Sequence, residues 1–230
     1  ALGWNGLLEL VRRAGELDLP RGFVAGASTD SLATAGTVSE QLEVMVQQAV
    51  AIEEAGGVPL LLPLAVLSRR RAREDEYVEV YRTLLGRLSG PVLIDWTGPA
   101  ARPELLDYFP GNSFERVMAL DPAKVRGARL GLADVARETR LRRACLGRDQ
   151  IVFTADREHL GRLLLGLNPG PAAPRVPTVE RFTELAGQRV ALGDFSHALL
   201  GGTLAQAETL ASALERLDAG DAAGLLSLLE

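Results

Sequence analysis

The chain has 230 residues, of which 47% are hydrophobic and 24% charged, and its formal net charge is −5. This is enough apolar material for one substantial core, so we expect a single domain over residues 1–230. The acidic balance excludes a clustered basic face for nucleic acid, and no apolar run reaches the roughly 18 residues of a membrane helix. With one cysteine, Cys145, and no signal peptide at its start, we expect a cytoplasmic protein without internal disulfides.

Short apolar runs alternate along the chain with longer amphipathic stretches. The short runs predict six strands, at Phe23–Ala27, Val58–Leu64, Pro91–Trp96, Val125–Leu132, Gln150–Thr154 and Ser196–Gly202. The amphipathic stretches predict helices within Ser39–Gly57, Asp75–Gly90 and Asp134–Gly147, and a helix pair over Leu204–Glu230. Ser39 is the expected N-cap of the first of these. Strand–helix alternation at about 30 residues per unit predicts a parallel sheet covered by helices.

One segment interrupts this alternation. Residues Asn168–Thr178, "NPGPAAPRVPT", are rich in proline and glycine and predict an inserted loop. Such an insertion is either a lid over a site or a plain surface excursion, and the sequence leaves both open.

Two architectures have this alternation, a doubly wound open sheet and a (β/α)8 TIM barrel. No glycine-rich phosphate-binding turn follows a predicted strand, as a dinucleotide-binding sheet requires. Polar residues instead follow several strand ends, namely Ser28, Thr29, Asp30, Asp95, Arg129, Asp156, Ser196 and His197. Functional residues at the ends of many different strands are typical of the TIM barrel, which we therefore favour.

The segments "AGASTDSL", "YRTLLGRLSGPVLIDWTG", "KVRGARLGLAD", "FTAD" and "GDFSHALLG" occur in an order that resembles the dihydrodipicolinate synthase and N-acetylneuraminate lyase superfamily. The resemblance covers the whole chain and is greatest to an uncharacterised bacterial branch, a domain of unknown function. It implies a (β/α)8 barrel and a homo-oligomer. Members typically act as aldolases or lyases: a lysine on strand six forms a Schiff base with a 2-oxo acid, and a tyrosine on strand five relays protons.

Mapped onto that family, Phe23–Ala27 is strand three and Ser196–Gly202 is strand eight. We therefore expect the first two strands to be missing from this chain, which would expose two sheet edges: either something covers them or the sequence shown is incomplete. The lysine position holds Arg129 and the tyrosine position holds Asp95. The only lysine, Lys124, lies about 16 Å from Arg129 along an extended strand and cannot replace it.

A guanidinium cannot form the Schiff base either, because its pKa lies far above neutral and keeps it protonated at pH 7. The first hypothesis is therefore a barrel that acts on or binds a small oxo or hydroxy acid without a cofactor. Arg129 would clamp the carboxylate, and Asp95 or His197 would carry the proton. The other expected substrate-binding residues are Ser28, Thr29, Asp30, Asp156 and Ser196.

Two further hypotheses stay open. Asp30, Asp95, Asp156 and His197 could converge on a divalent ion, although no tight ligand spacing supports this and we assign no metal ligand. Alternatively, the chain is a catalytically degenerate barrel that serves as a binding or oligomer-forming subunit.

The same residues also have structural interpretations. Thr29, Asp30 and Asp156 suit turns or helix caps, and His197 suits a satisfied structural histidine. Because a buried unpaired arginine is costly, we expect Arg129 to contact Asp95 directly or through one water. The strand ends with Asp30, Asp95, Arg129 and Asp156 should share one rim within about 12 Å, with Val125, Gly127, Arg129 and Gly131 on the inward face.

Overall fold

The computed structural model describes residues 4–17, 19, 22–29, 32, 36–97, 105, 107–170, 172–199 and 207–229. The helices are α1 (Trp4–Glu16), α2 (Val38–Glu54), α3 (Ala65–Arg69), α4 (Glu74–Gly86), α5 (Ser113–Met118), α6 (Val135–Leu146), α7 (Leu160–Leu164), α8 (Ala207–Asp218) and α9 (Ala222–Leu229). The strands are β1 (Val24–Ala27), β2 (Val58–Leu61), β3 (Val92–Thr97), β4 (Val125–Gly131), β5 (Ile151–Thr154), β6 (Arg181–Leu185), β7 (Gln188–Leu192) and β8 (His197–Ala198). No helix of these described segments is long and apolar enough to cross a membrane.

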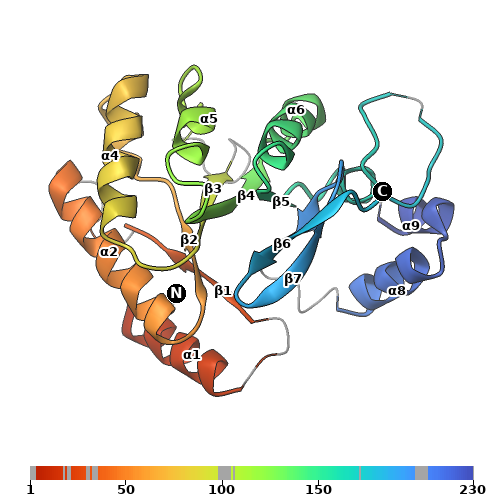
Figure 1. Ribbon diagram of the computed structural model, residues 1–230, viewed down its shortest axis with the longest axis horizontal. Helices are drawn as coiled ribbons and strands as arrows, with labels where there is room; N and C mark the ends of the chain where they lie inside the picture. Colours follow the sequence, from red (N-terminus) through yellow and green to blue (C-terminus); the bar gives the residue numbers. More distant parts are fainter. Residues whose placement is uncertain are drawn as a thin grey trace.

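Six of the strands form one parallel sheet in the order β1-β2-β3-β4-β5-β8. Each of the six predicted segments contains one of these strands, although β2 and β8 are shorter than predicted, and residues 200–202 of the last segment lie outside the described residues. Strands that follow one another in the sheet pair side by side and parallel, as in a TIM barrel. Helices α2, α4, α5 and α6 line one side of the curved sheet (Figure 1). The result is a six-strand parallel half-barrel, as expected for strands three to eight of a TIM barrel.

The larger core lies between the sheet and these helices. Ile94, Trp96, Ala128 and Leu130 alternate toward the helix side, where they are buried with side chains such as Met45 of α2. Around Trp96 the core is aromatic, because Tyr77, Tyr81, Tyr108, Phe109 and Phe114 stack edge-on or tilted at ring distances of 4.7 to 5.7 Å. This core fixes the outer side of β3 and β4.

The opposite, inner face of the sheet is covered by the antiparallel hairpin β6–β7, which was not predicted. Leu185 and Leu192 of the hairpin are buried against Leu60, Leu93 and Ile151 of the sheet. In Figure 1 the hairpin lies on the side of the sheet away from α4 and α5. The inner apolar residues of the half-barrel are thus shielded from water by a later segment of the same chain.

Hydrogen bonds from two side chains, Arg126 and His197, fix the hairpin to the sheet. Arg126 of β4 donates from Nε to the Glu184 carbonyl at 3.2 Å and from Nη2 to the Thr183 hydroxyl. His197 of β8 lies with Nε2 at 2.8 Å from the Ala191 carbonyl. The described residues of the predicted loop at 168–178 have neither helix nor strand, and the segment leads directly into this hairpin. That the segment is an insertion stays a prediction.

Strand β4 contains a bulge that changes one predicted orientation. Val125 pairs with Val92, but Gly127 already pairs with Leu93, so Arg126 is an extra residue in the ladder. Val125 therefore packs in the outer core, and its predicted inward orientation is wrong. Gly127 is needed here, because a Cβ atom would lie 2.2 Å from the Ile151 carbonyl oxygen.

Helix boundaries also differ from the prediction. The N-cap of α2 is Thr37, not Ser39: its hydroxyl accepts from the Glu40 amide at 3.2 Å, and the Glu40 carboxylate accepts from the Thr37 amide at 2.7 Å. This reciprocal capping box satisfies two otherwise orphaned amides, so the helix begins two residues earlier than predicted. Helix α4 ends at Gly86 rather than continuing to Gly90.

Candidate functional site

The candidate site is built on the pair Asp95 and Arg129, which occupy directly opposed positions on β3 and β4. Nη1 of Arg129 donates to Oδ1 of Asp95 at 3.1 Å, and Nε donates to the Leu199 carbonyl at 3.1 Å. The Asp95 side chain is 1% exposed and that of Arg129 24%. The predicted contact is confirmed, and it is direct.

Four residues in register form a row across the inner face at this level. Asp95 pairs with Arg129, Arg129 with Phe153, and Phe153 with His197, on the strands β3, β4, β5 and β8. Because side chains alternate, this row shares its face with Leu93, Gly127 and Ile151, two residues earlier on their strands. The polar row therefore lies on the carboxyl side of the apolar patch that the hairpin covers, the side where barrels place their ligands.

The guanidinium of Arg129 is held on two sides. Asp95 neutralises it and the Leu199 carbonyl orients its Nε edge, while Nη2 bonds to none of the described residues. A planar fork that is already oriented loses little entropy when it binds a carboxylate. The geometry thus provides a partly exposed donor for a small anion.

His197 is tied to the hairpin. A carbonyl only accepts hydrogen bonds, so the 2.8 Å contact with Ala191 places the proton on Nε2 and leaves Nδ1 as an acceptor. Burial lowers the pKa of His197 below its usual value, so the ring is neutral at pH 7. This arrangement satisfies the structural interpretation of His197, and its role as a proton carrier stays a prediction.

The polar residues after β1 are held by glutamines of α2. The Ser28 amide donates to the Gln48 side chain at 2.7 Å, and the buried Thr29 hydroxyl lies 3.4 Å from Oε1 of Gln41. Asp30 lies outside the described residues. Substrate binding by Ser28 and Thr29 stays a prediction, and the contacts shown are structural.

Asp156 caps the turn that precedes α7. Its Oδ1 accepts from the amides of Glu158 and His159 at 3.0 and 3.1 Å, and its Oδ2 lies 3.0 Å from Nδ1 of His159. Asp156 lies two residues after Thr154, the last residue of β5, which pairs with Leu130 next to Arg129. Asp156 is therefore at the same end of the sheet as Arg129. Ser196 is buried; its amide donates to the Leu163 carbonyl at 2.9 Å, and its hydroxyl has no partner among the described residues.

Neither alternative nucleophile reaches the site. Nζ of Lys124 donates to the carbonyls of Leu85 and Leu88 at 2.9 and 2.8 Å, at the C-terminal end of α4. Cys145 is buried in the helix layer, and desolvation raises the pKa of its thiol to about 12. Both residues therefore have structural roles, and neither supplies a nucleophile at Arg129. Within the described segments, no group of three or more His, Cys, Asp or Glu side chains is placed to hold a metal ion.

A cluster of ionisable side chains beside the sheet, with Glu138 and Arg142 buried, was missed. Arg142 of α6 donates from Nε and Nη2 to Oδ1 of Asp194 at 3.1 and 2.7 Å. One turn earlier, Glu138 is 1% exposed, and desolvation raises its pKa to about 8, with the charge of Asp156 adding to this and Arg142 opposing it. Glu138 is therefore largely protonated at pH 7. The only signal in the sequence was the spacing of four between two charged residues, which exposed helices share.

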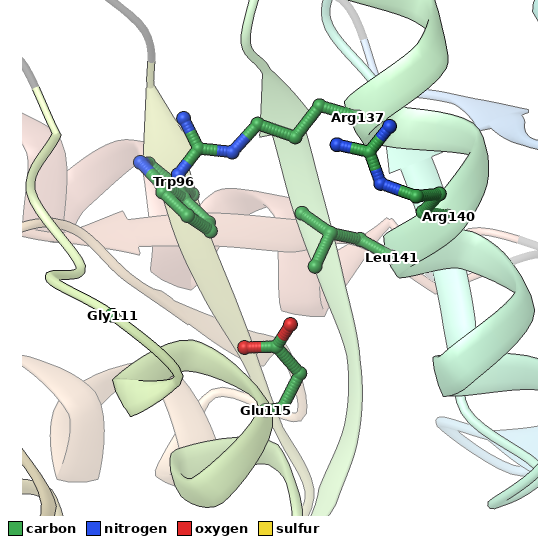
Figure 2. A pocket seen from close by; sticks show the side chains of 6 residues that line it. All are labelled: Trp96, Gly111, Glu115, Arg137, Arg140 and Leu141. Atoms are coloured by element: carbon green, nitrogen blue, oxygen red, sulfur yellow. The ribbon is translucent and has the colours of Figure 1, made fainter.

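A cavity lies in the helix layer between α5 and α6, and all the residues that line it are described (Figure 2). Arg129 is not among them. It is lined by Trp96, Gly111, Glu115, Arg137, Arg140 and Leu141. Trp96 follows Asp95 on β3 and points to the opposite side of the sheet. The two features are therefore separate.

Solved structures share the fold of this chain. The chain is similar to YagE, a prophage protein of the dihydrodipicolinic acid synthase family from E. coli K12 solved in complex with pyruvate, with 12% identity and a TM-score of 0.67 over 99% of this chain and 62% of that chain. It is also similar to N-acetylneuraminate lyase from Mycoplasma synoviae, with 14% identity and a TM-score of 0.64 over 99% of this chain and 62% of that one. This chain spans less than two thirds of their length, and such low identities show the fold alone.

No curated protein matches the sequence. The family described as "Protein of unknown function (DUF993)" matches residues 1–230. Its match agrees with the expected branch of barrels of unknown function. The chain belongs to the DUF993 family and has the fold of the dihydrodipicolinate synthase and N-acetylneuraminate lyase barrels.

Proposed function

We propose that Arg129 binds the carboxylate of a small oxo or hydroxy acid at the inner face of the half-barrel, without a Schiff base. The observation that carries the proposal is the guanidinium itself, held by Asp95 and the Leu199 carbonyl and still 24% exposed. The pyruvate in the YagE structure supports the ligand class.

The proposed chemistry is electrostatic. In the related barrels a lysine amine would stabilise a carbanion next to the keto group as an enamine; here no amine is available, since Lys124 caps α4. An enolate formed from a bound oxo acid would instead be stabilised by the positive charge of Arg129. Asp95, in direct contact with that guanidinium, is the group proposed to accept the proton.

A second candidate is a binding subunit without catalysis. It is favoured by the engagement of the other polar residues, because His197 holds the hairpin and both oxygens of Asp156 cap a turn. Binding without turnover of a panel of oxo and hydroxy acids would support this candidate. Turnover would support the lyase-like enzyme.

Isothermal titration of pyruvate and lactate into the wild-type chain tests the binding. Arg129→Gln should weaken the affinity by about tenfold or more, because it removes a charged donor from a partly buried site. Arg129→Lys keeps the charge but not the planar fork of the guanidinium, so its affinity should lie between those of Arg129→Gln and the wild type. Arg82→Gln, which removes an exposed arginine of α4, is the matched control and should bind like the wild type. Equal affinity of Arg129→Gln and wild type would refute the proposal.

We also propose a homo-oligomer and a cytoplasmic location, which the family resemblance and the composition favour. Light scattering of the purified chain tests the first, and cell fractionation tests the second. A monomer would leave the ligand proposal intact, since every residue in it comes from one chain.

A further inference from the structure

The cavity between α5 and α6 has a volume of about 210 Å³ and lies on the helix side of β3. Its polar side chains come from two different helices: Glu115 from α5, Arg137 and Arg140 from α6 (Figure 2). Ligand cavities for drug-sized molecules are typically about 300 to 1,000 Å³. This cavity therefore suits a smaller molecule.

One wall of the cavity is rigid. The Trp96 ring packs 5.1 Å from Phe109 and 5.0 Å from Phe114, and only 3% of the residue is exposed. The guanidinium of Arg137 lies 4.6 Å from the centre of the same ring and 3.3 Å from the Asp107 carboxylate. Arg137 is thus stacked and neutralised, and it closes the indole side of the cavity.

The other two charges of the cavity have no such partners. Among the described residues, no carboxylate pairs with Arg140 and no cation pairs with Glu115. Figure 2 shows the Glu115 carboxylate and the Arg140 guanidinium on opposite sides of the Leu141 side chain. One cation and one anion that form no ion pair within the described part of the chain, with an apolar surface between them, therefore face one small cavity.

We propose that this cavity binds a zwitterion of the α-amino-acid class with a short apolar side chain. Arg140 would pair with the carboxylate, Glu115 with the ammonium group, and Leu141 with the apolar side chain. A simple anion would be repelled by Glu115, and a simple cation by Arg140, so only a ligand with both charges compensates both. The site is independent of Arg129, since Trp96 and Asp95 point to opposite sides of β3.

Titration of L-leucine, followed by the fluorescence of Trp96, tests the proposal. The chain has two tryptophans, so a Trp4→Phe background leaves Trp96 as the only indole. L-leucine should change the emission and bind more tightly than isocaproate, which lacks the amine, or isoamylamine, which lacks the carboxylate. No change with L-leucine, or equal binding of isocaproate or isoamylamine, would overturn the proposal.

Three variants locate the binding. Glu115→Gln should weaken the affinity for L-leucine by about fivefold and abolish the preference for L-leucine over isocaproate. Arg140→Gln should weaken it by a similar factor and abolish the preference for L-leucine over isoamylamine. Both residues are on the helix surface, so both variants should fold, which circular dichroism checks. Arg129→Gln should leave L-leucine binding unchanged. Loss of binding in folded Arg129→Gln, or wild-type binding in both cavity variants, would contradict the assignment.

Discussion

Arg129 and Asp95 meet at 3.1 Å from opposed positions of neighbouring parallel strands, and the carboxylate is fully buried while a quarter of the arginine side chain is exposed. The pair is therefore an internal ion pair on one side and an accessible donor on the other. The structural and the functional interpretations of Arg129 are compatible, because they use different nitrogens of the same guanidinium.

Arg129→Ala should lower the free energy of unfolding by about 3 kcal/mol, because it leaves the Asp95 carboxylate buried without its cation. This loss is at the low end of the roughly 3 to 5 kcal/mol expected when one partner of a buried ion pair is removed, because Arg129 is partly exposed. Chemical denaturation measures the loss. The double variant Asp95→Leu, Arg129→Met should recover most of it, and a double variant as unstable as Arg129→Ala would show that the missing packing, not the orphaned charge, dominates.

Glu138 should make the fold less stable at alkaline pH. Its folded-state pKa of about 8 is above the ordinary value of 4.5, so the native state binds more protons than the unfolded state between these values. Stability is therefore fully present below about pH 4.5 and falls as the pH rises toward 8, by at most about 1.4 kcal/mol per pH unit. Glu138→Gln should flatten this dependence in denaturation curves between pH 5 and 9. The exposed control Glu79→Gln should keep the wild-type slope, and an unchanged slope in Glu138→Gln would contradict the assignment.

The hairpin should depend on Arg126, which contacts Thr183 and Glu184 of β6. Arg126→Ala should speed amide hydrogen exchange in β6 and β7 while α4 and β3 keep their protection, because each lost hydrogen bond contributes about 1 kcal/mol. Arg82→Ala is the control. Uniform loss of protection across the sheet would mean that the hairpin and the sheet open as one unit.

The six strands and the Asp95–Arg129 pair could be predicted, because buried parallel strands have continuous apolar runs and a lone cation inside them requires an anion. The bulge at Arg126 could not, since it follows from the pairing with β3 and leaves no mark in the order of residues. The same holds for Glu138 and Arg142: their spacing is that of an exposed helix face, and only tertiary packing buries them.

The hairpin was missed for a different reason. Its two-residue turn, Ala186 and Gly187, has positive φ angles of 52° and 71°, which suits a tight hairpin turn. The usual Asn-Gly or Asp-Gly signal is absent, and Phe182 and Glu184 are exposed on one side, so the alternation of its strands is weak. Because the hairpin directly follows the Pro/Gly-rich loop, its residues are easily taken for a continuation of that loop and not for strands.

Carbon-13 NMR of pyruvate labelled at its keto carbon tests the central claim most directly. With the wild-type chain, the ketone resonance should broaden or shift slightly as pyruvate exchanges with the site, and borohydride should add no mass to the protein. With Arg129→Gln, the resonance should stay as in buffer. A new imine resonance, a reduced adduct on the protein, or equal broadening by Arg129→Gln would contradict noncovalent carboxylate binding by Arg129.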